Sequence, residues 1–109
     1  MGDDHHDQPM FEFRPLGVGV RTYSTPMNVS WPFPRKLLVY REGLAFVLFS
    51  AETWVPRERI TRLLRGPGYI RVKWRFEDDI ASATASDWFR ITQIASAFEQ
   101  AGYTFGAPD

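Results

Sequence analysis

The sequence contains no cysteine, so disulfides, thiolate nucleophiles and cysteine-based zinc sites are excluded. Histidine is almost as scarce, since His5 and His6 are the only two and both precede residue 10. The rest of the chain therefore has no histidine base for a Ser-His-Asp arrangement. A glycine-rich phosphate loop is also missing, because the Gly-Pro-Gly of residues 66–68 has no Lys-Ser/Thr pair after it and is typical of a turn. These absences predict a protein that is not an enzyme.

Two groups of carboxylates and imidazoles are present, and neither predicts a metal site. Residues 3–7, DDHHD, can chelate a divalent ion, but a flexible tail is not preorganised to hold one. Glu77, Asp78 and Asp79 are adjacent, whereas a calcium loop needs spaced ligands and a glycine. We expect no metal and no cofactor.

Long hydrophobic runs are lacking too, and none approaches the roughly 20 residues that cross a bilayer. The first residues are acidic and polar, unlike a signal peptide. A chain of 109 residues suits one hydrophobic core. We therefore expect a flexible acidic leader over residues 1–9, a single domain over residues 10–105, and a cytoplasmic location.

What the chain has in quantity is aromatic residues, 16% of the total, and a segregated charge. The net charge is zero, yet residues 35–75 hold ten Lys or Arg against three Glu, a difference of +7. Segregation of this kind can create a local positive field on a neutral protein. The alternative is that the arginines simply occupy the solvent side of alternating strands.

The clearest strand is Tyr69–Phe76, in which apolar and basic residues alternate. Its even-numbered positions, among them Trp74 and Phe76, are predicted to face the core, as are Phe46, Phe49 and Phe98. Its odd-numbered positions form a candidate basic face. The candidate binding residues on this face and on the preceding segment are Arg57, Arg59, Arg62, Arg71, Lys73 and Arg75.

Other elements follow from turn residues and periodicity. The predicted extended segments are 11–14 at a sheet edge, 16–23, 36–41 and 44–49, with a turn at Glu42-Gly43 and loops over 24–34 and 77–86. Residues 88–91 are predicted as a short strand or a lead into a helix. That helix spans about 92–101, with Thr92 as its cap and Gly102 as its stop.

Residues 53–65 allow two interpretations. Pro56 can open a helix whose apolar stripe is Ile60, Leu63 and Leu64. Alternatively, residues 53–55 and 60–64 are two short strands separated by a polar turn. Local pattern slightly favours the helix.

The order of these elements resembles the PH-like superfold of small bacterial PH-like and GRAM-type domains. The resemblance rests on WPFPRKLLVYREGLAF (31–46), WVPRERITRLLR (54–65), YIRVKWRF (69–76) and WFRITQIASAFEQAGY (88–103). It implies a mainly β (α+β) fold, namely a bent antiparallel barrel of about seven strands capped by the C-terminal helix. It also implies that residues 53–65 are strands.

The chain departs from that family where some PH domains bind phosphoinositides, in the loop between the first two strands. The corresponding segment, residues 24–34, has no Lys or Arg. Trp31 and Phe33 in this segment can line a groove beside Arg35 and Lys36 or can cover an open end of the barrel.

Together these features predict a binding or interaction module that recognises a protein segment or an anionic membrane surface through its basic strand face. A nucleic-acid-binding small β-barrel is the alternative. It is disfavoured because alternation places Trp74 opposite the basic residues, so bases have no ring to stack on. Self-association through an exposed edge, at residues 11–14 or 18–23, is a further expectation.

Overall fold

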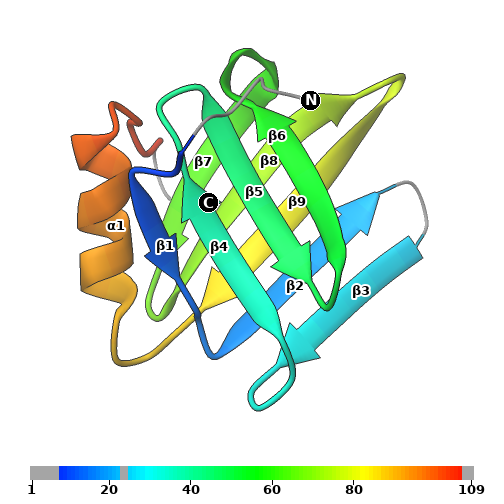
Figure 1. Ribbon diagram of the computed structural model, residues 1–109. Helices are drawn as coiled ribbons and strands as arrows, with labels where there is room; N and C mark the ends of the chain where they lie inside the picture. Colours follow the sequence, from blue (N-terminus) through cyan, green and yellow to red (C-terminus); the bar gives the residue numbers. More distant parts are fainter. Residues whose placement is uncertain (1–7, 23–24, 107–109) are drawn as a thin grey trace.

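The computed structural model describes residues 8–22 and 25–106, which form nine strands, one short 3₁₀ turn and one helix (Figure 1). The elements are β1 (Phe11–Phe13), β2 (Gly17–Thr22), β3 (Thr25–Ser30), β4 (Arg35–Val39), β5 (Gly43–Leu48), β6 (Ala51–Pro56), η1 (Arg57–Arg59), β7 (Ile60–Gly66), β8 (Tyr69–Phe76), β9 (Asp79–Ser86) and α1 (Ile91–Gln100). The predicted leader lies outside the described residues, apart from Gln8 and Pro9.

The strands form two antiparallel sheets, ordered β1-β4-β5-β6 and β3-β2-β9-β8-β7. In Figure 1 the two sheets lie one in front of the other with their strands running in clearly different directions, and α1 lies along one side beside β1. The prediction of a mainly β fold with one C-terminal helix is confirmed. The prediction of a barrel of about seven strands is wrong, because the described residues form nine strands in two separate sheets.

The core fills the space between the sheets and under the helix. Strand β8 alternates as predicted, with Ile70, Val72 and Trp74 each about 1% exposed. Its neighbour β9 turns three alanines to the same side, and Ala81 lies directly opposite Trp74 in the ladder. A small residue beside a large one lets the indole fit at interior packing density. The large inward side chains of β8 therefore fill the space that the small inward side chains of β9 leave in the core.

Residues 53–65 are two strands joined by the 3₁₀ turn, as the family resemblance implied and against the local helical pattern. Strand β6 pairs with β5, whereas β7 pairs with β8, so the turn carries the chain from one sheet to the other. The packing of both sheets thus overrides a weak helical preference.

Several other predictions are wrong. Residues 77–86 are not a loop, because only Glu77 and Asp78 turn before β9 begins. Residues 24–34 are not wholly a loop, since β3 occupies much of them as an edge strand that tolerates Pro26. Residues 18–22 offer no free edge, because β2 lies between β3 and β9, and residue 23 lies outside the described residues. The predicted edge segment at β1 is confirmed.

The helix occupies nearly its predicted range but is not capped by Thr92. The carboxylate of buried Asp87 accepts hydrogen bonds from the backbone N–H groups of Phe89 and Arg90, at 3.0 and 3.1 Å, just before the first turn. Gly102 ends the helix at a φ of 97°, as predicted. The next residue, Tyr103, folds back so that its N–H bonds to the carbonyl of Phe98.

Tyr103 fastens this C-terminal segment to the four-stranded sheet. Its hydroxyl donates a 2.7 Å hydrogen bond to the carbonyl oxygen of Tyr40, which follows β4. Burial raises the pKa of Tyr103 to about 12; Arg57 opposes this rise, and Glu42 adds to it. The folded protein therefore keeps the hydroxyl of Tyr103 protonated to a higher pH than the unfolded chain does.

Stability is expected to fall at alkaline pH because of this tyrosine. The pKa of Tyr103 is raised from 10.0 to about 12 on folding, so its contribution is complete below pH 10 and is lost as the pH rises through 12. The loss is on the order of 2 kcal/mol. Urea unfolding at a series of pH values will measure it. Tyr103→Phe should be less stable at neutral pH and should show a shallower alkaline decline; an equal decline in both proteins would refute the assignment.

Candidate functional site

The outward face of the five-stranded sheet presents polar side chains in rows across the strands. The ladder register places Lys73 of β8 opposite Ser82 of β9, which in turn lies opposite Arg21 of β2. One row along, Arg71 lies opposite Thr84, and Gly19 follows on β2. Asn28 of β3 pairs with Gly19 and ends this second row.

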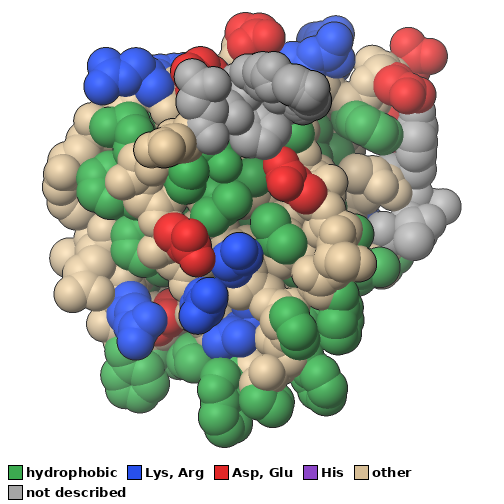
Figure 2. Space-filling view, viewed as in Figure 1, with side chains coloured by type: hydrophobic (Ala, Val, Ile, Leu, Met, Phe, Trp, Pro, Cys, Tyr) green, Lys and Arg blue, Asp and Glu red, His purple; other side chains and the backbone are tan. Residues whose placement is uncertain are grey.

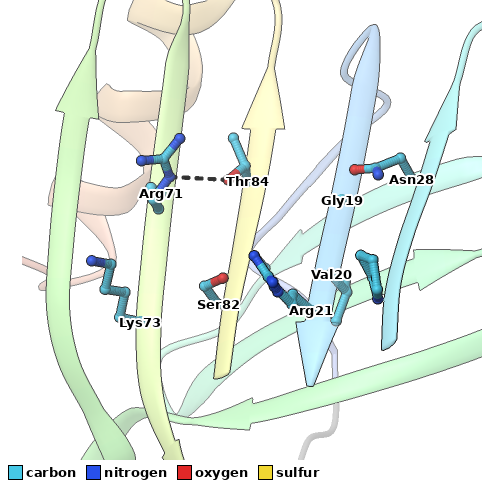
Figure 3. Close-up of a pocket in the computed structure, with 10 residues that line it drawn as sticks. Gly19, Val20, Arg21, Asn28, Arg71, Lys73, Ser82 and Thr84 are labelled. Carbon is cyan, nitrogen blue, oxygen red and sulfur yellow. Dashed lines mark hydrogen bonds between the residues drawn. The ribbon is translucent and has the colours of Figure 1, made fainter. Parts of the chain in front are cut away.

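These rows border a hollow of about 510 Å³, here called the basic groove (Figure 3). Gly19 has no side chain, and the Asn28 amide lies where its Cβ would be. The groove is hollowed because small residues on β9 and β2 separate the larger side chains of Arg21, Arg71 and Lys73. The lining residues are Gly19, Val20, Arg21, Pro26, Asn28, Arg71, Lys73, Ser82, Ala83 and Thr84.

The chemistry of the basic groove is that of an anion site. None of its lining residues is acidic, and no described carboxylate forms an ion pair with Arg21, Arg71 or Lys73. Arg71 is partly fixed, since its Nε donates a 3.3 Å hydrogen bond to the Thr84 hydroxyl and its guanidinium lies 5.1 Å from the ring centre of Tyr69. Cationic, hydroxyl and amide groups therefore line one open depression. Such groups suit carboxylate or phosphate oxygens.

The structure separates the basic residues that the sequence groups together. Arg71 and Lys73 line the groove, and Arg75 follows on the same outward side of β8. Arg62 lies opposite Lys73 in the β7–β8 ladder. Arg59 is exposed on the 3₁₀ turn, away from the residues that line the groove.

Arg57 has a different position from the others. Its guanidinium donates hydrogen bonds to the carbonyl oxygens of Arg41, Ala101 and Gly102 and lies 4.5 Å from the ring centre of Tyr103. Arg57 thus provides hydrogen-bond donors for carbonyl oxygens at the end of α1, and it links this end of the helix to the β4–β5 turn. This geometry makes Arg57 a structural residue.

Of the residues that line the groove, only Arg71 and Lys73 were candidate residues. Asn28, Ser82 and Thr84 were missed because the segments that carry β3 and β9 were predicted as loops. Arg21 lies in a segment that was predicted to be extended, but it was not singled out as a binding residue. A signal was present in β9, where Ala81, Ala83 and Ala85 alternate with Ser and Thr over DIASATAS. Strict period-two alternation predicts a strand even when the inward residues are only alanines.

Trp31 and Phe33 neither line the basic groove nor cover the core. They lie on the β3–β4 loop with exposures of 68% and 57%. The prediction that Phe49 faces the core is also wrong, because Phe49 occupies the β5–β6 turn at a φ of 57° and is 54% exposed. Bulky residues with positive φ are uncommon, since the backbone conformation is strained.

Arg35 holds the base of this exposed region. It is 9% exposed, and its guanidinium donates hydrogen bonds of 2.5 and 2.9 Å to the carbonyl oxygens of Pro15 and Phe33. The β1–β2 link and the β3–β4 loop are therefore fastened to the same buried cation. Trp31 borders a hollow of about 490 Å³ together with Arg35, so the predicted neighbourhood of these two residues is real.

Within residues 8–22 and 25–106, no three His, Asp or Glu side chains come together as a metal-binding group. In the same part of the chain, no helix has the length and apolar character needed to cross a membrane. The candidate metal ligands of residues 3–7 lie outside the described residues.

Comparison with protein-family models, curated proteins and solved structures gives no match to this chain.

Proposed function

We propose that this chain is a non-catalytic PH-like binding module whose basic groove recognises an acidic protein segment. The antiparallel sheets and the C-terminal helix support a module of this type, although the sheets do not close into a barrel. One observation carries the functional part: Arg21, Arg71 and Lys73 surround one hollow whose lining includes no carboxylate. Carboxylates of a bound segment would supply the missing negative charge.

An acidic segment fits better than a single-stranded nucleic acid. Nucleic-acid surfaces of that kind stack bases on exposed aromatic rings. The indole of Trp74 is buried on the opposite side of β8, and Tyr69, which is half-buried beside the groove, already has the Arg71 guanidinium over its ring. The groove offers charge and hydrogen bonds without a free stacking platform among its lining residues.

The test is fluorescence anisotropy with a labelled glutamate-rich peptide at low salt. Arg71→Gln combined with Lys73→Gln should weaken binding by about tenfold or more, because two charge-assisted contacts are removed. The matched control is Arg59→Gln with Arg65→Gln, which lowers the net charge equally but lies outside the groove. Gly19→Ala keeps the charge and places a methyl group against Asn28, so it should weaken binding through shape alone.

The same assay with labelled single-stranded and duplex DNA distinguishes nucleic-acid binding from binding of an acidic segment. Tighter binding of DNA than of the peptide, with a steep salt dependence, would replace the acidic segment by nucleic acid. Peptide binding that is absent, or equally weakened by the control pair, would overturn the proposal.

A further inference from the structure

Four connecting segments meet at one end of the molecule and carry exposed apolar side chains. They are the β1–β2 link, the β3–β4 loop, the β5–β6 turn and the β9–α1 link. The backbone N–H of Trp31 donates to the carbonyl oxygen of Leu16 at 2.8 Å, and that of Phe49 donates to Pro34 at 3.0 Å. Leu16, Trp31 and Phe89 border one hollow. We call Leu16, Trp31, Phe33, Phe49 and Phe89 the aromatic end.

The rings of the aromatic end project from the molecule. Phe89 is 86% exposed, and each of the other three rings is more than half exposed. Figure 2 shows hydrophobic side chains gathered at the lower end of the molecule, where the β3–β4 loop lies in Figure 1. Single exposed apolar residues are ordinary, but a contiguous group of this kind marks an interaction surface.

Cationic side chains surround the rings. Arg14 and Arg90 line the hollow between Trp31 and Phe89, and Arg14 and Lys36 line a second hollow of about 320 Å³ beside Phe49. Figure 2 shows Lys and Arg side chains just above the hydrophobic group. Three acids are close. Glu12 lies 3.7 Å from Arg14, and buried Asp87 lines the hollow beside Trp31 and Phe89. Glu52 lies opposite Val47, which also pairs with Lys36. The cations Arg14, Lys36 and Arg90 still outnumber the exposed carboxylates of Glu12 and Glu52.

We infer that the aromatic end docks on an anionic lipid bilayer, with its rings in the headgroup–acyl boundary and its cations at the level of the lipid phosphates. Trp and Phe are well suited to that boundary, where rings penetrate by about 5–10 Å. The cations complement the negative surface potential of an anionic leaflet. The core of a protein–protein interface is packed as densely as a protein interior, whereas these rings stand on the tips of separate loops.

The anchoring of the loops supports this inference. The two hydrogen bonds of Arg35 fix the loop of Trp31 and Phe33, and the carboxylate of Asp87 fixes the backbone of Phe89. Phe49 is held at a positive φ, which turns its ring outward at an energetic cost. The rings are thus presented by a rigid base, so little ordering entropy is lost on docking.

This inference does not depend on the proposed function. The basic groove is built from strands of the five-stranded sheet, and none of its lining residues belongs to the aromatic end. A chain docked through its aromatic end would leave the groove open to a partner.

The experiment is flotation of the full chain with vesicles of phosphatidylcholine and phosphatidylserine, and with vesicles of phosphatidylcholine alone. The unaltered chain should float with the mixed vesicles and much less with the neutral ones. Trp31→Ser with Phe89→Ser should weaken partition by about 100-fold, since each buried ring contributes about tenfold. Arg14→Gln with Arg90→Gln should weaken it by about 30-fold on the mixed vesicles only.

Matched control variants distinguish flotation through the aromatic end from an effect of the overall hydrophobicity or charge of the chain. Met27→Ser with Ile80→Ser removes two apolar side chains that are each about half exposed and lie outside the aromatic end, and it should leave flotation unchanged. Arg71→Gln with Lys73→Gln should also leave flotation nearly unchanged while weakening peptide binding, so the two proposals fail separately. Far-ultraviolet circular dichroism confirms that each variant is folded.

Three results would overturn the inference. The first is no flotation of the unaltered chain with mixed vesicles at low salt. The second is flotation that Trp31→Ser with Phe89→Ser does not change. The third is a concentration-dependent dimer in sedimentation, lost in the same double variant, without vesicle binding; this result would identify the occupant as a second copy of the chain.

Discussion

Phe98→Ala should lower the free energy of unfolding by about 3–5 kcal/mol, the range for removing a large ring from a core. Phe98 is a fully buried residue on the inner face of α1, with its ring centre 5.7 Å from that of Tyr103 and 5.8 Å from that of Phe105. It therefore joins the helix, the C-terminal segment and the space between the sheets. Its removal leaves a cavity at the point where these parts meet.

Urea unfolding followed by circular dichroism measures this loss as a lower midpoint with an unchanged slope. Phe89→Ala is the matched control, because the same ring is removed only nine positions earlier at an exposed site. The control should change stability by less than about 0.5 kcal/mol. Equal effects of the two substitutions would show that α1 does not pack over the core through Phe98.

Arg57→Met should destabilise the protein by about 2–3 kcal/mol. Methionine keeps an unbranched apolar stem like that of arginine but has no donor for the carbonyl oxygens of Arg41, Ala101 and Gly102. Hydrogen bonds from a charged donor contribute about 1.5–3 kcal/mol each. The sum is smaller because the hydrogen bonds to Arg41 and Gly102 are exposed, so those carbonyls regain water.

The same substitution has a second readout. Arg57 lowers the pKa of Tyr103 against the larger effect of burial, so its removal should move the upper end of the alkaline decline in stability to higher pH, while the decline still begins near pH 10. Arg59→Met, in the same 3₁₀ turn but exposed, should change neither stability nor the alkaline decline. A loss of stability without movement of the decline would mean that Arg57 and Tyr103 are not electrostatically coupled.

The local sequence pattern was sufficient to predict a strand or helix where one face of that element is strongly apolar. Strand β8 has the bounds that its alternation predicts, and α1 follows its apolar stripe to within a residue. Pattern failed in β9, whose inward residues are alanines, and in β3, whose Pro26 is tolerated only because the strand is at an edge. These two strands are specified by their neighbours more than by their own side chains.

The same limit applies to the candidate site. Alternation placed Arg71 and Lys73 on a solvent face, because the apolar Val72 between them and Trp74 after them must be buried. Arg21 and Thr84 could not be added, since the groove exists only when β2 pairs with β9. Phe49 was predicted to be buried from its position at the end of an apolar run, but the turn there directs it to solvent.

The central position of β9 also constrains the order in which the chain can assemble. Strand β2 has paired with β3 early in the sequence, yet its other edge is completed only by residues 82–86. On the ribosome, one edge of the β2–β3 hairpin stays unpaired until residues 82–86 have emerged. Pairing of strands so far apart makes folding slow, and it makes that hairpin the segment most in need of protection during synthesis.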